Sequence, residues 1–478
     1  YGCAEQTTSK GYAALILDPA TSSLLGTDGL DARARRERME GAFGRLASMQ
    51  VANGNFSMWG DDGNVDPWLT PYITEFLLDA RDAGFAVPDT VLQKALNRLS
   101  EDLLSGGNPF YGQDDREKLK FANQAYAGYV LARVNRAPLG TLRTLYDNER
   151  GKAVGGLALV HLGVALSLQG DAKRGQAALA AAFATPSSKR PAYFGDYGSA
   201  IRDDALMIAL THENRLAKPA WDARAVDLGR GLEARRAAGW MWLSTQEQVA
   251  IARLGKALAA NQKARVAGEL VVGGNREAVG ERALFARTFT GSELDSGVRF
   301  SPQGQPPMFA SIDVAGIPRT APAPDSSVVG VERAYFSVDG RPWTPRPLKE
   351  GEALIVRVTV SADAQMPDAL LTDLLPAGLE VENFNLGDAK QWADVVVDGI
   401  TLSERSAAAD TRHEEFRDDR YVAALKLPRG GRASVFYLVR AVTPGTYSVP
   451  PPLVEDMYRP QLRGVGRSTP ATITVVQP

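Results

Sequence analysis

The pattern of apolar residues changes once along this sequence, near Asn261, and the change limits what each part can fold into. Before it, alanine- and leucine-rich stretches repeat apolar residues at helical spacing: KFANQAYAGYVLARVN, AVGGLALVHLGVALSLQGD, DDALMIALTHE and STQEQVAIARLGKALAA. After it come short, β-branched, roughly alternating stretches separated by Gly and Pro: GELVVGG, PPMFASIDVAGIP, ALIVRVTVSA, YVAALKLP, RASVFYLVRAV and ATITVVQP. The sequence therefore predicts an all-α domain followed by β-sandwich domains.

The length of the chain calls for more than one core. Single cores rarely grow past roughly 250–300 residues, and this chain has 478. We expect an all-α domain over 1–262, a smaller β segment over 263–330 and a β-sandwich over 331–478, with RTAPAPDSSVVG as the linker between the last two. Helix pairs joined by unlike loops, without a short exact repeat, favour a closed toroid of helices over an open array.

The composition and net charge of the chain argue against several classes of function. The formal net charge of −2 provides no basic field for a nucleic acid. No apolar run approaches the roughly 20 residues of a membrane-spanning helix. The single cysteine gives no internal disulfide framework, and His161, His212 and His413 lie far apart in sequence, so we expect no metal or other cofactor. Because the chain starts at Tyr1 without a signal peptide, we expect a piece of a longer protein.

The only cysteine, Cys3, precedes Gln6 by three residues in the opening stretch YGCAEQTTSKGYAALIL. On a helix these side chains lie about one turn apart, close enough to meet. If the Cys3 sulfur displaces ammonia from the Gln6 carboxamide, the product is an internal thioester, an activated acyl group that amines attack and water destroys. Such a group survives only behind apolar or aromatic walls. The alternative is a buried Cys3 of no special reactivity beside a solvated Gln6.

The surroundings of this pair resemble a known family. GCAEQ is similar to the GC-x-EQ thioester signature of the complement and α2-macroglobulin proteins, with Ala4 at the variable position. QVANGNFSMWGDDGNVDPWLTPYITEFL is similar to the segment of that family in which a glycine and aromatic residues precede a Trp-Leu-Thr-x-Tyr helix: Gly54, Phe56, Trp59, Trp68, Leu69, Thr70 and Tyr72. DYGSAIRDDALMIAL and WLSTQEQVAIA resemble later helices of the thioester domain in bacterial members. LLTDLLPAGLEVEN, EEFRDDRYVAAL and VEDMYRP resemble their C-terminal macroglobulin sandwich. The resemblance therefore covers nearly the whole chain, in order.

The resemblance implies a covalent protease trap. It implies a helical toroid as the thioester domain, a CUB-like or macroglobulin-like segment over 263–330 and a macroglobulin-like sandwich at the C-terminus. Family members are cut by a protease in a bait segment and then expose the thioester, which a lysine amine of the attacker opens. In this sequence Cys3 is the leaving group and Gln6 supplies the acyl carbon, while Glu5 matches the motif without an acyl role. The protein is then a single-use reagent and not an enzyme.

The resemblance also implies partners and a cellular location for the protein. Its partners are target proteases, bound covalently, and by family association a penicillin-binding protein. We expect a monomer in the periplasm, with the parent protein lipid-anchored to the inner membrane. The bait segment lies outside this sequence.

The shield against water is expected from the last domain. VEDMYRP matches the stretch that covers the thioester in bacterial members, so Tyr458 and Met457 are the candidate lid, with Tyr1 contributing from the near side. The alternative is that Tyr458 and Met457 only plug the edge of their own sandwich. Some complement members also use a histidine to pass the acyl group to hydroxyls. The matching region, SGGNPFYGQDD, contains none, and His161 and His212 fall in other helices. The sequence therefore predicts direct attack by amines.

Two other functions remain open from the sequence. A glycoside hydrolase or lyase on a helical toroid would use a carboxylate pair, Asp62 with Asp204 or Glu247, as general acid and base. A surface adhesin would use the same thioester to bond host proteins. The alternative for these acidic residues is a structural role: Asp61, Asp62 and Asp66 form turns, and Asp203 and Asp204 begin a helix.

Overall fold

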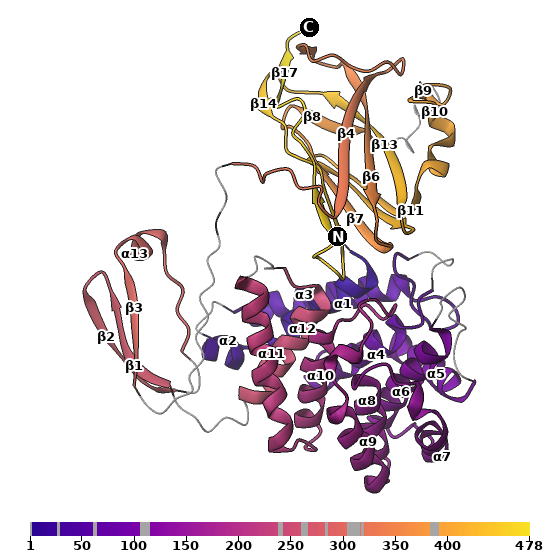
Figure 1. The fold of residues 1–478 in the computed structure, drawn as a ribbon, viewed down its shortest axis with the longest axis vertical. Coiled ribbons are helices and arrows are strands. Elements are labelled where there is room, and N and C mark those ends of the chain that lie inside the picture. Colours follow the sequence, from indigo (N-terminus) through magenta and orange to yellow (C-terminus); the bar gives the residue numbers. More distant parts are fainter. Residues whose placement is uncertain are drawn as a thin grey trace. The chain divides into compact units, whose positions relative to one another are not determined.

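The computed structural model describes residues 2–25, 29–60, 65–105, 115–237, 242–259, 266–282, 285–303, 316, 320–382 and 392–478 (Figure 1). The chain forms two compact units, Tyr1–Ile312 and Asp313–Pro478. Within the described residues, no helix is long and apolar enough to cross a membrane. The stretch PPMFASIDVAGIP, expected to contain a strand, lies almost wholly outside the described residues.

Unit 1 begins with a run of helices. They are α1 (Ala4–Ile16), α2 (Pro19–Leu25), α3 (Ala32–Met49), α4 (Leu69–Asp82), α5 (Asp89–Ser105), α6 (Arg116–Ala132), α7 (Leu139–Thr144), α8 (Leu157–Leu168), α9 (Ala172–Ala184), α10 (Ala200–Glu213), α11 (Pro219–Ala237) and α12 (Thr245–Ala259). Short 3₁₀ or π turns occupy Leu145–Glu149, Arg150–Lys152 and Ser187–Lys189.

Six of the described helices pack in a cyclic order. The contacts run α1 to α4, α4 to α6, α6 to α8, α8 to α10, α10 to α12, and α12 back to α1. Helix α8 is buried on almost every side, as expected for a helix that is apolar all round, and α6 is buried from Phe121 onward. By contrast α3 buries one stripe, Met39, Phe43, Leu46 and Met49, at helical spacing against the same core. The first and last helices of the run are therefore neighbours.

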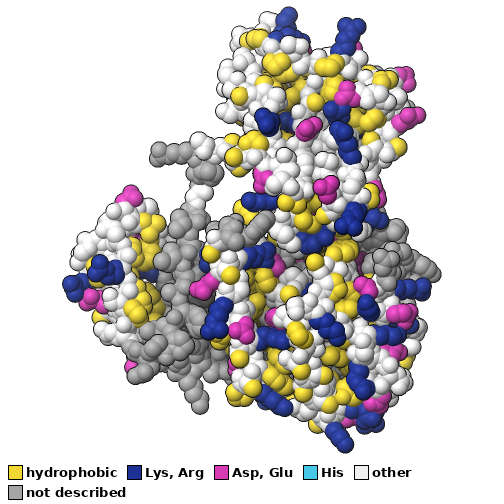
Figure 2. Space-filling model, in the orientation of Figure 1, with side chains coloured by type: hydrophobic (Ala, Val, Ile, Leu, Met, Phe, Trp, Pro, Cys, Tyr) yellow, Lys and Arg dark blue, Asp and Glu magenta, His cyan; other side chains and the backbone are white. Residues whose placement is uncertain are grey.

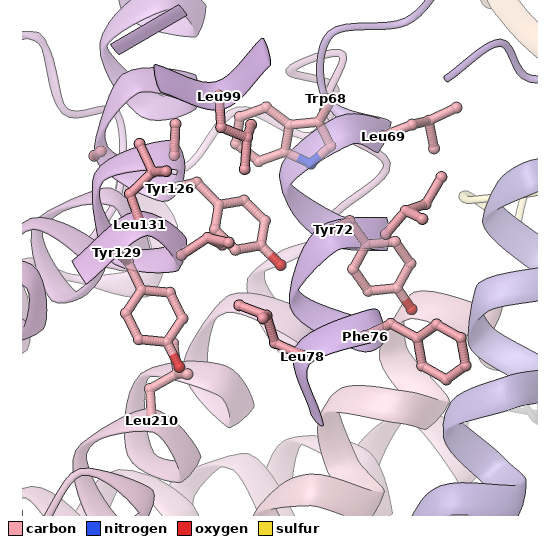
Figure 3. Close-up of a cluster of buried hydrophobic side chains, with 14 of the residues drawn as sticks. Trp68, Leu69, Tyr72, Phe76, Leu78, Leu99, Tyr126, Tyr129, Leu131 and Leu210 are labelled. Atoms are coloured by element: carbon pink, nitrogen blue, oxygen red, sulfur yellow. The ribbon is translucent and has the colours of Figure 1, made fainter. Parts of the chain in front are cut away.

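Aromatic side chains fill the core of this helical part. Figure 3 shows Trp68 beside Tyr126, while Tyr72 and Phe76 lie on the opposite side of α4 from Tyr126 and Tyr129. The ring centroids of Trp68 and Tyr126 lie 5.9 Å apart at an angle of 55°, within the range of favourable tilted aromatic pairs. These residues belong to the same hydrophobic cluster as Cys3 and Ala4 at the start of α1.

Unit 1 also contains a small antiparallel sheet. Its strands are β1 (Val266–Val272), β2 (Asn275–Arg282) and β3 (Val298–Gln303), in the order β2–β1–β3, and α13 (Gly291–Asp295) lies between β2 and β3 in sequence. Phe285 and Phe300 stack with centroids 5.4 Å apart, while Leu270 and Val279 are buried.

Unit 2 consists of mainly antiparallel sheets around one core. Its strands are β4 (Val329–Ser337), β5 (Leu348–Lys349), β6 (Ala353–Ala362), β7 (Met366–Leu374), β8 (Leu379–Glu382), β9 (Val396–Val397), β10 (Ile400–Thr401), β11 (Asp410–Arg417), β12 (Arg420–Leu427), β13 (Gly431–Ala441), β14 (Gly445–Ser448), β15 (Leu453–Asp456), β16 (Arg463–Val465) and β17 (Thr472–Val476), with a 3₁₀ segment at Leu402–Ala408. The two larger sheets have the orders β11–β12–β7–β15–β16 and β4–β6–β13–β8. The sheets share an apolar core that includes Val358, Leu371 and Val435.

A buried polar group ties the two larger sheets together. Arg333 Nη1 on β4 lies 2.5 Å from Asp373 Oδ1 on β7, and Tyr437 Oη on β13 donates to Asp373 Oδ2 at 2.6 Å. Burial raises the pKa of Asp373, an effect that the Arg333 guanidinium opposes. The carboxylate thus receives a partner from each of two strands of the facing sheet.

The arrangement confirms an α-helical part followed by β-sheet domains. The cyclic order of helices agrees with a toroid, but the toroidal and CUB-like assignments stay predictions, as does the division at 262 and 330. On the face drawn in Figure 2, basic and acidic side chains are interspersed over the described surface of each unit. Neither unit presents a large area of one sign on this face.

Candidate functional site

Cys3 and Gln6 occupy the two ends of the first turn of α1. Cys3 is the N-cap, with extended backbone angles of φ −66° and ψ 161°, and its Sγ accepts a hydrogen bond from the Gln6 backbone N–H at 3.3 Å. Gln6 is therefore the third helical residue. In a capping box, a Glu or Gln at that position reaches back toward the N-cap residue. The carboxamide of Gln6 is thus carried on the same helical turn as the thiol of Cys3.

The thiol lies in an apolar setting. Cys3 is fully buried and belongs to a hydrophobic cluster with Phe56, Met58, Trp68 and Tyr72. Gln6 is partly buried. The four apolar residues come from the segment that resembles the thioester family, so the structure brings two separate parts of the resemblance into one cluster. An acyl group at this position would have the water-excluding walls that its survival requires.

The backbone of the loop before α4 secures the start of α1. Ala4 N–H, which has no acceptor within its own helix, donates to Met58 O at 2.8 Å. This loop depends on Gly54, whose φ is +89°, and a Cβ there would come 2.4 Å from Lys94 O. Only glycine fits both conditions. Gly54 therefore supports the loop that holds the first turn of α1.

Glu5 is the site residue whose role the sequence did not reveal. It is fully buried, and its carboxylate accepts hydrogen bonds from Ser9 Oγ at 2.6 Å, Thr245 Oγ1 at 2.8 Å and Gln246 Nε2 at 2.8 Å. Ser9 Oγ also lies 2.8 Å from Tyr72 Oη. Thr245 and Gln246 are the first two residues of α12. The acidic residue of the motif therefore joins the first helix to the last one.

The start of α12 is itself capped. Ser244 N–H donates to Glu247 Oε2 at 2.9 Å, and Glu247 N–H donates to Ser244 Oγ at 3.2 Å, which is a capping box. Ser199 Oγ and Arg235 Nη1 bind Glu247 Oε1 at 2.7 and 3.3 Å. Glu247 therefore fixes the direction of α12, a structural use of the carboxylate.

The hydrolase hypothesis names three carboxylates. The two that the structure describes, Asp204 and Glu247, form hydrogen bonds that support the fold. Asp204 accepts hydrogen bonds from Ser187 Oγ at 2.6 Å and Arg224 Nη1 at 3.2 Å. Asp62 lies outside the described residues. With Glu247 engaged at the cap of α12, neither described carboxylate has the geometry of a general acid or base facing a cleft.

His161 and His212 lie on α8 and α10. His161 is buried and stacks against the rings of both Tyr126 and Tyr129, with centroid distances of 4.2 and 5.5 Å. Burial lowers the pKa of His161 well below its ordinary value, and the positive charge of Arg202 adds to the effect. His212 Nε2 lies 2.8 Å from Asp222 Oδ1. His161 is thus a buried histidine of the core.

The proposed shield residues divide between the units. Met457 and Tyr458 follow β15 in unit 2; Met457 N–H donates to Asp368 O at 3.0 Å and Tyr458 N–H to Asp456 Oδ1 at 3.1 Å. Among the described residues, the sandwich core cluster does not include Tyr458. Tyr1 lies outside the described residues. The lid assignment stays a prediction.

A cavity of about 560 Å³ lies between the C-terminal turns of α1, α4, α10 and α12. Its charged side chains form ion pairs with one another: Lys256 with Asp18 at 2.8 Å, and Arg133 with Asp79 at 2.6 Å. Cys3 is at the opposite end of α1 from this cavity. The cavity is therefore separate from the first turn.

Comparison with known proteins agrees with this fold. The sequence model described as "Bacterial Alpha-2-macroglobulin MG10 domain" matches residues 329–461. A curated relative, Alpha-2-macroglobulin of Xylella fastidiosa strain Temecula1, is 67% identical over 478 residues, which is 100% of this chain and 29% of the relative. The helical ring, the sandwich and the Cys-x-x-Gln turn thus define a macroglobulin-type chain that spans less than a third of its curated relative.

Solved structures give the same result at the level of the fold. Native alpha-2-macroglobulin of Escherichia coli, from domain MG7 to the C-terminus, has a TM-score of 0.85 and 34% identity; the match covers 100% of this chain and 73% of that one. The chain belongs to the bacterial alpha-2-macroglobulin family. Salmonella alpha-2-macroglobulin reacted with methylamine has a TM-score of 0.87 and 36% identity, over 100% of this chain and 30% of that one. Trypsin-activated E. coli alpha-2-macroglobulin, with a TM-score of 0.50 and 34% identity, is matched over 100% of this chain and 32% of that one.

Proposed function

We propose that this chain carries the reactive part of a bacterial protease inhibitor, with an internal thioester between Cys3 and Gln6. The ring forms when the Cys3 sulfur attacks the Gln6 side-chain carbon, with loss of the thiol proton and release of one ammonia. A lysine amine of a protease then attacks the same carbon. The C–S bond breaks, an amide bond forms, and the departing sulfur takes up a proton to become a thiol. Each molecule reacts once.

The observation that carries this proposal is the capped first turn of α1. The Gln6 backbone N–H donates to Cys3 Sγ at 3.3 Å, so the sulfur already lies over the turn that holds the carboxamide. A reaction between groups held by one turn gains from proximity, because the ends need no further search to meet. Cys3 is also fully buried, which suits a bond that water would cleave.

Two relatives support the chemistry and the target. The structure of the Salmonella relative is of protein reacted with methylamine, a small amine of the kind that opens a thioester. The structure of the E. coli relative is of protein activated by trypsin, a protease. We therefore assign to this chain a protease as covalent partner and an amine as the attacking group. The alternatives, a carboxylate-based hydrolase and an adhesin, have no such support.

The expected selectivity is for amines over hydroxyls. Transfer to hydroxyls through a histidine needs an imidazole at the acyl carbon, and His161 is instead stacked against Tyr126 and Tyr129 in the core. A primary amine is nucleophilic enough to attack the thioester without that intermediate. We assign the cover of the thioester to Tyr458 with Met457. A periplasmic location, a lipid anchor on the parent protein and an association with a penicillin-binding protein complete the proposal as expectations from the family.

Intact mass with thiol titration tests the proposal. The expected result is a mass one ammonia below that of the sequence, followed on methylamine treatment by addition of one methylamine and release of one thiol. Gln6→Glu should show neither the ammonia loss nor the addition. A wild-type protein with the full glutamine mass and a titratable thiol from the start would refute the thioester.

A further inference from the structure

We propose that Glu5 is a positioning residue, which holds the first turn of α1 in the register that the Cys3–Gln6 thioester needs by binding the start of α12. The inference rests on the proposed thioester and adds to it a residue with a defined task. Glu5 lies between the two reacting residues in sequence and is fully buried. Its role therefore has to be sought in what its carboxylate binds.

The carboxylate of Glu5 is held from two directions. Ser9 Oγ, one turn further along α1, donates to Oε1 at 2.6 Å. From α12, Thr245 Oγ1 lies 2.9 and 2.8 Å from the two carboxylate oxygens, and Gln246 Nε2 donates to Oε1 at 2.8 Å. Hydrogen bonds to an ionised acceptor are about twice as strong as those between neutral groups. Glu5 is thus clamped between its own helix and a helix that begins 240 residues later.

The donors on α12 are themselves fixed in direction. Thr245 and Gln246 lie inside the capping box that Ser244 and Glu247 form at the start of that helix. A capped turn has little freedom to rotate, because its backbone N–H groups are already engaged. The backbone that carries the two donors is therefore held in place beside Glu5.

The hydrogen bonds from Thr245 and Gln246 to Glu5, here called the clamp, fix the rotation of α1 about its own axis. Residues at the second and third helical positions differ by about 100° around a helix with 3.6 residues per turn. When Glu5 is fixed against α12, the direction of Gln6 is fixed as well. In this first turn the Gln6 N–H donates to Cys3 Sγ at 3.3 Å and the Ala4 N–H to Met58 O at 2.8 Å; a turn released from the clamp can fray, because helix starts have few intrahelical bonds. Fraying would move the acyl carbon and admit water to it.

A double variant tests the inference while leaving Glu5 and both reacting residues in place. Thr245→Val with Gln246→Leu removes the α12 donors at similar side-chain volume. The matched control is Thr211→Val with Gln124→Leu, which removes a threonine hydroxyl and a glutamine amide that bond to Ile208 O at 2.8 Å and Leu103 O at 3.1 Å elsewhere in unit 1. The measurement is the rate of thiol release in amine-free buffer, on the protein as the cell makes it, beside the urea midpoint of unfolding.

The expected result is faster spontaneous thiol release in Thr245→Val/Gln246→Leu, by about tenfold, which corresponds to a barrier lowered by ~1.4 kcal/mol. The control pair should lose comparable stability and release thiol at the wild-type rate. Equal rates in both double variants would overturn the positioning role. A wild-type protein without the ammonia loss would remove the proposed function, and this inference with it, so the two failures are told apart by the wild-type mass.

Discussion

The imidazole of His161 lies flat against the ring of Tyr126, with centroids 4.2 Å apart and planes inclined by 7°. The phenol of Tyr126 in turn donates to Glu75 Oε2. Glu75 is buried, and Arg253 Nη1 lies 2.9 Å from its other oxygen. A stack of aromatic rings thus leads from a neutral histidine to a buried ion pair at the centre of the helices.

The stability of unit 1 should depend on pH through His161. Burial holds the pKa of folded His161 well below its ordinary value of about 6.5, so the unfolded chain binds the extra proton as pH falls. This contribution to stability is complete above pH ~6.5 and is lost below it, by at most about 1.4 kcal/mol per pH unit. Urea unfolding at pH 7.5 and 5 should therefore show a smaller loss for His161→Phe than for wild type. His413→Gln, in unit 2, is the control and should keep the wild-type loss. Equal losses in all three proteins would contradict the assignment.

Substitution of Cys3 or Gln6 should remove the reaction with methylamine and leave the fold in place. Cys3→Ala and Gln6→Ala should each abolish methylamine incorporation completely, because each removes one partner of the ring. Loss of the cap in Cys3→Ala should cost no more than about 1 kcal/mol in unfolding free energy. Mass spectrometry follows incorporation and circular dichroism the fold. Incorporation that survives in Cys3→Ala would place the acyl chemistry elsewhere.

Removal of the proposed lid should shorten the life of the thioester. Tyr458→Ala should raise the rate of thiol release in amine-free buffer by about tenfold, which corresponds to ~1.4 kcal/mol of barrier. Tyr447→Ala is the matched control: this tyrosine is on β14 of the same sandwich, and its hydroxyl donates to Pro444 O at 3.0 Å. If Tyr458 only plugs its own sandwich, both variants will lower the melting temperature and neither will change the rate.

The buried charges of unit 1 should matter far more for stability than exposed ones. Arg253 is buried and binds Glu213 at 2.7 Å and Glu75 at 2.9 Å. Arg253→Met leaves two carboxylates without their cation and should cost about 3–5 kcal/mol of unfolding free energy. Arg33→Met, which breaks an exposed pair with Glu37, should change it little. Similar urea midpoints for the two variants would show that the Arg253 pairs are dispensable.

Local pattern was enough to predict several long elements of the fold and the change from helices to strands. The stretch ALIVRVTVSA coincides with β6, and STQEQVAIARLGKALAA contains α12 with one further residue at each end. These elements are long and strongly periodic, so short-range sequence information determines them. The short outer helix α7 was not singled out, because six residues carry too little periodicity to mark a helix.

The site was predictable in part for the same reason. Cys3 and Gln6 are three residues apart, so their spacing predicts one shared helical turn, which α1 confirms, while the thioester between them stays a prediction. The partners of Glu5 were not predictable, since Thr245 and Gln246 meet it only through the packing of α12 on α1. The signal that could have indicated α12 is the Ser-x-x-Glu sequence at Ser244, which marks a helix start but not its neighbour. Contacts over such separations depend on the complete fold.

The cyclic order of the helices has a consequence for synthesis in the cell. The ribosome delivers Glu5 at the beginning of this stretch and Thr245 240 residues later, which at about 5–20 residues per second is a delay of roughly 10–50 s. During that interval the turn that carries the thiol and the carboxamide has no α12 to bind. Only when the last helix docks can the first turn take its final form. In the proposed function, the Cys3–Gln6 thioester is thus completed late, after the helices of unit 1 that surround it have been made.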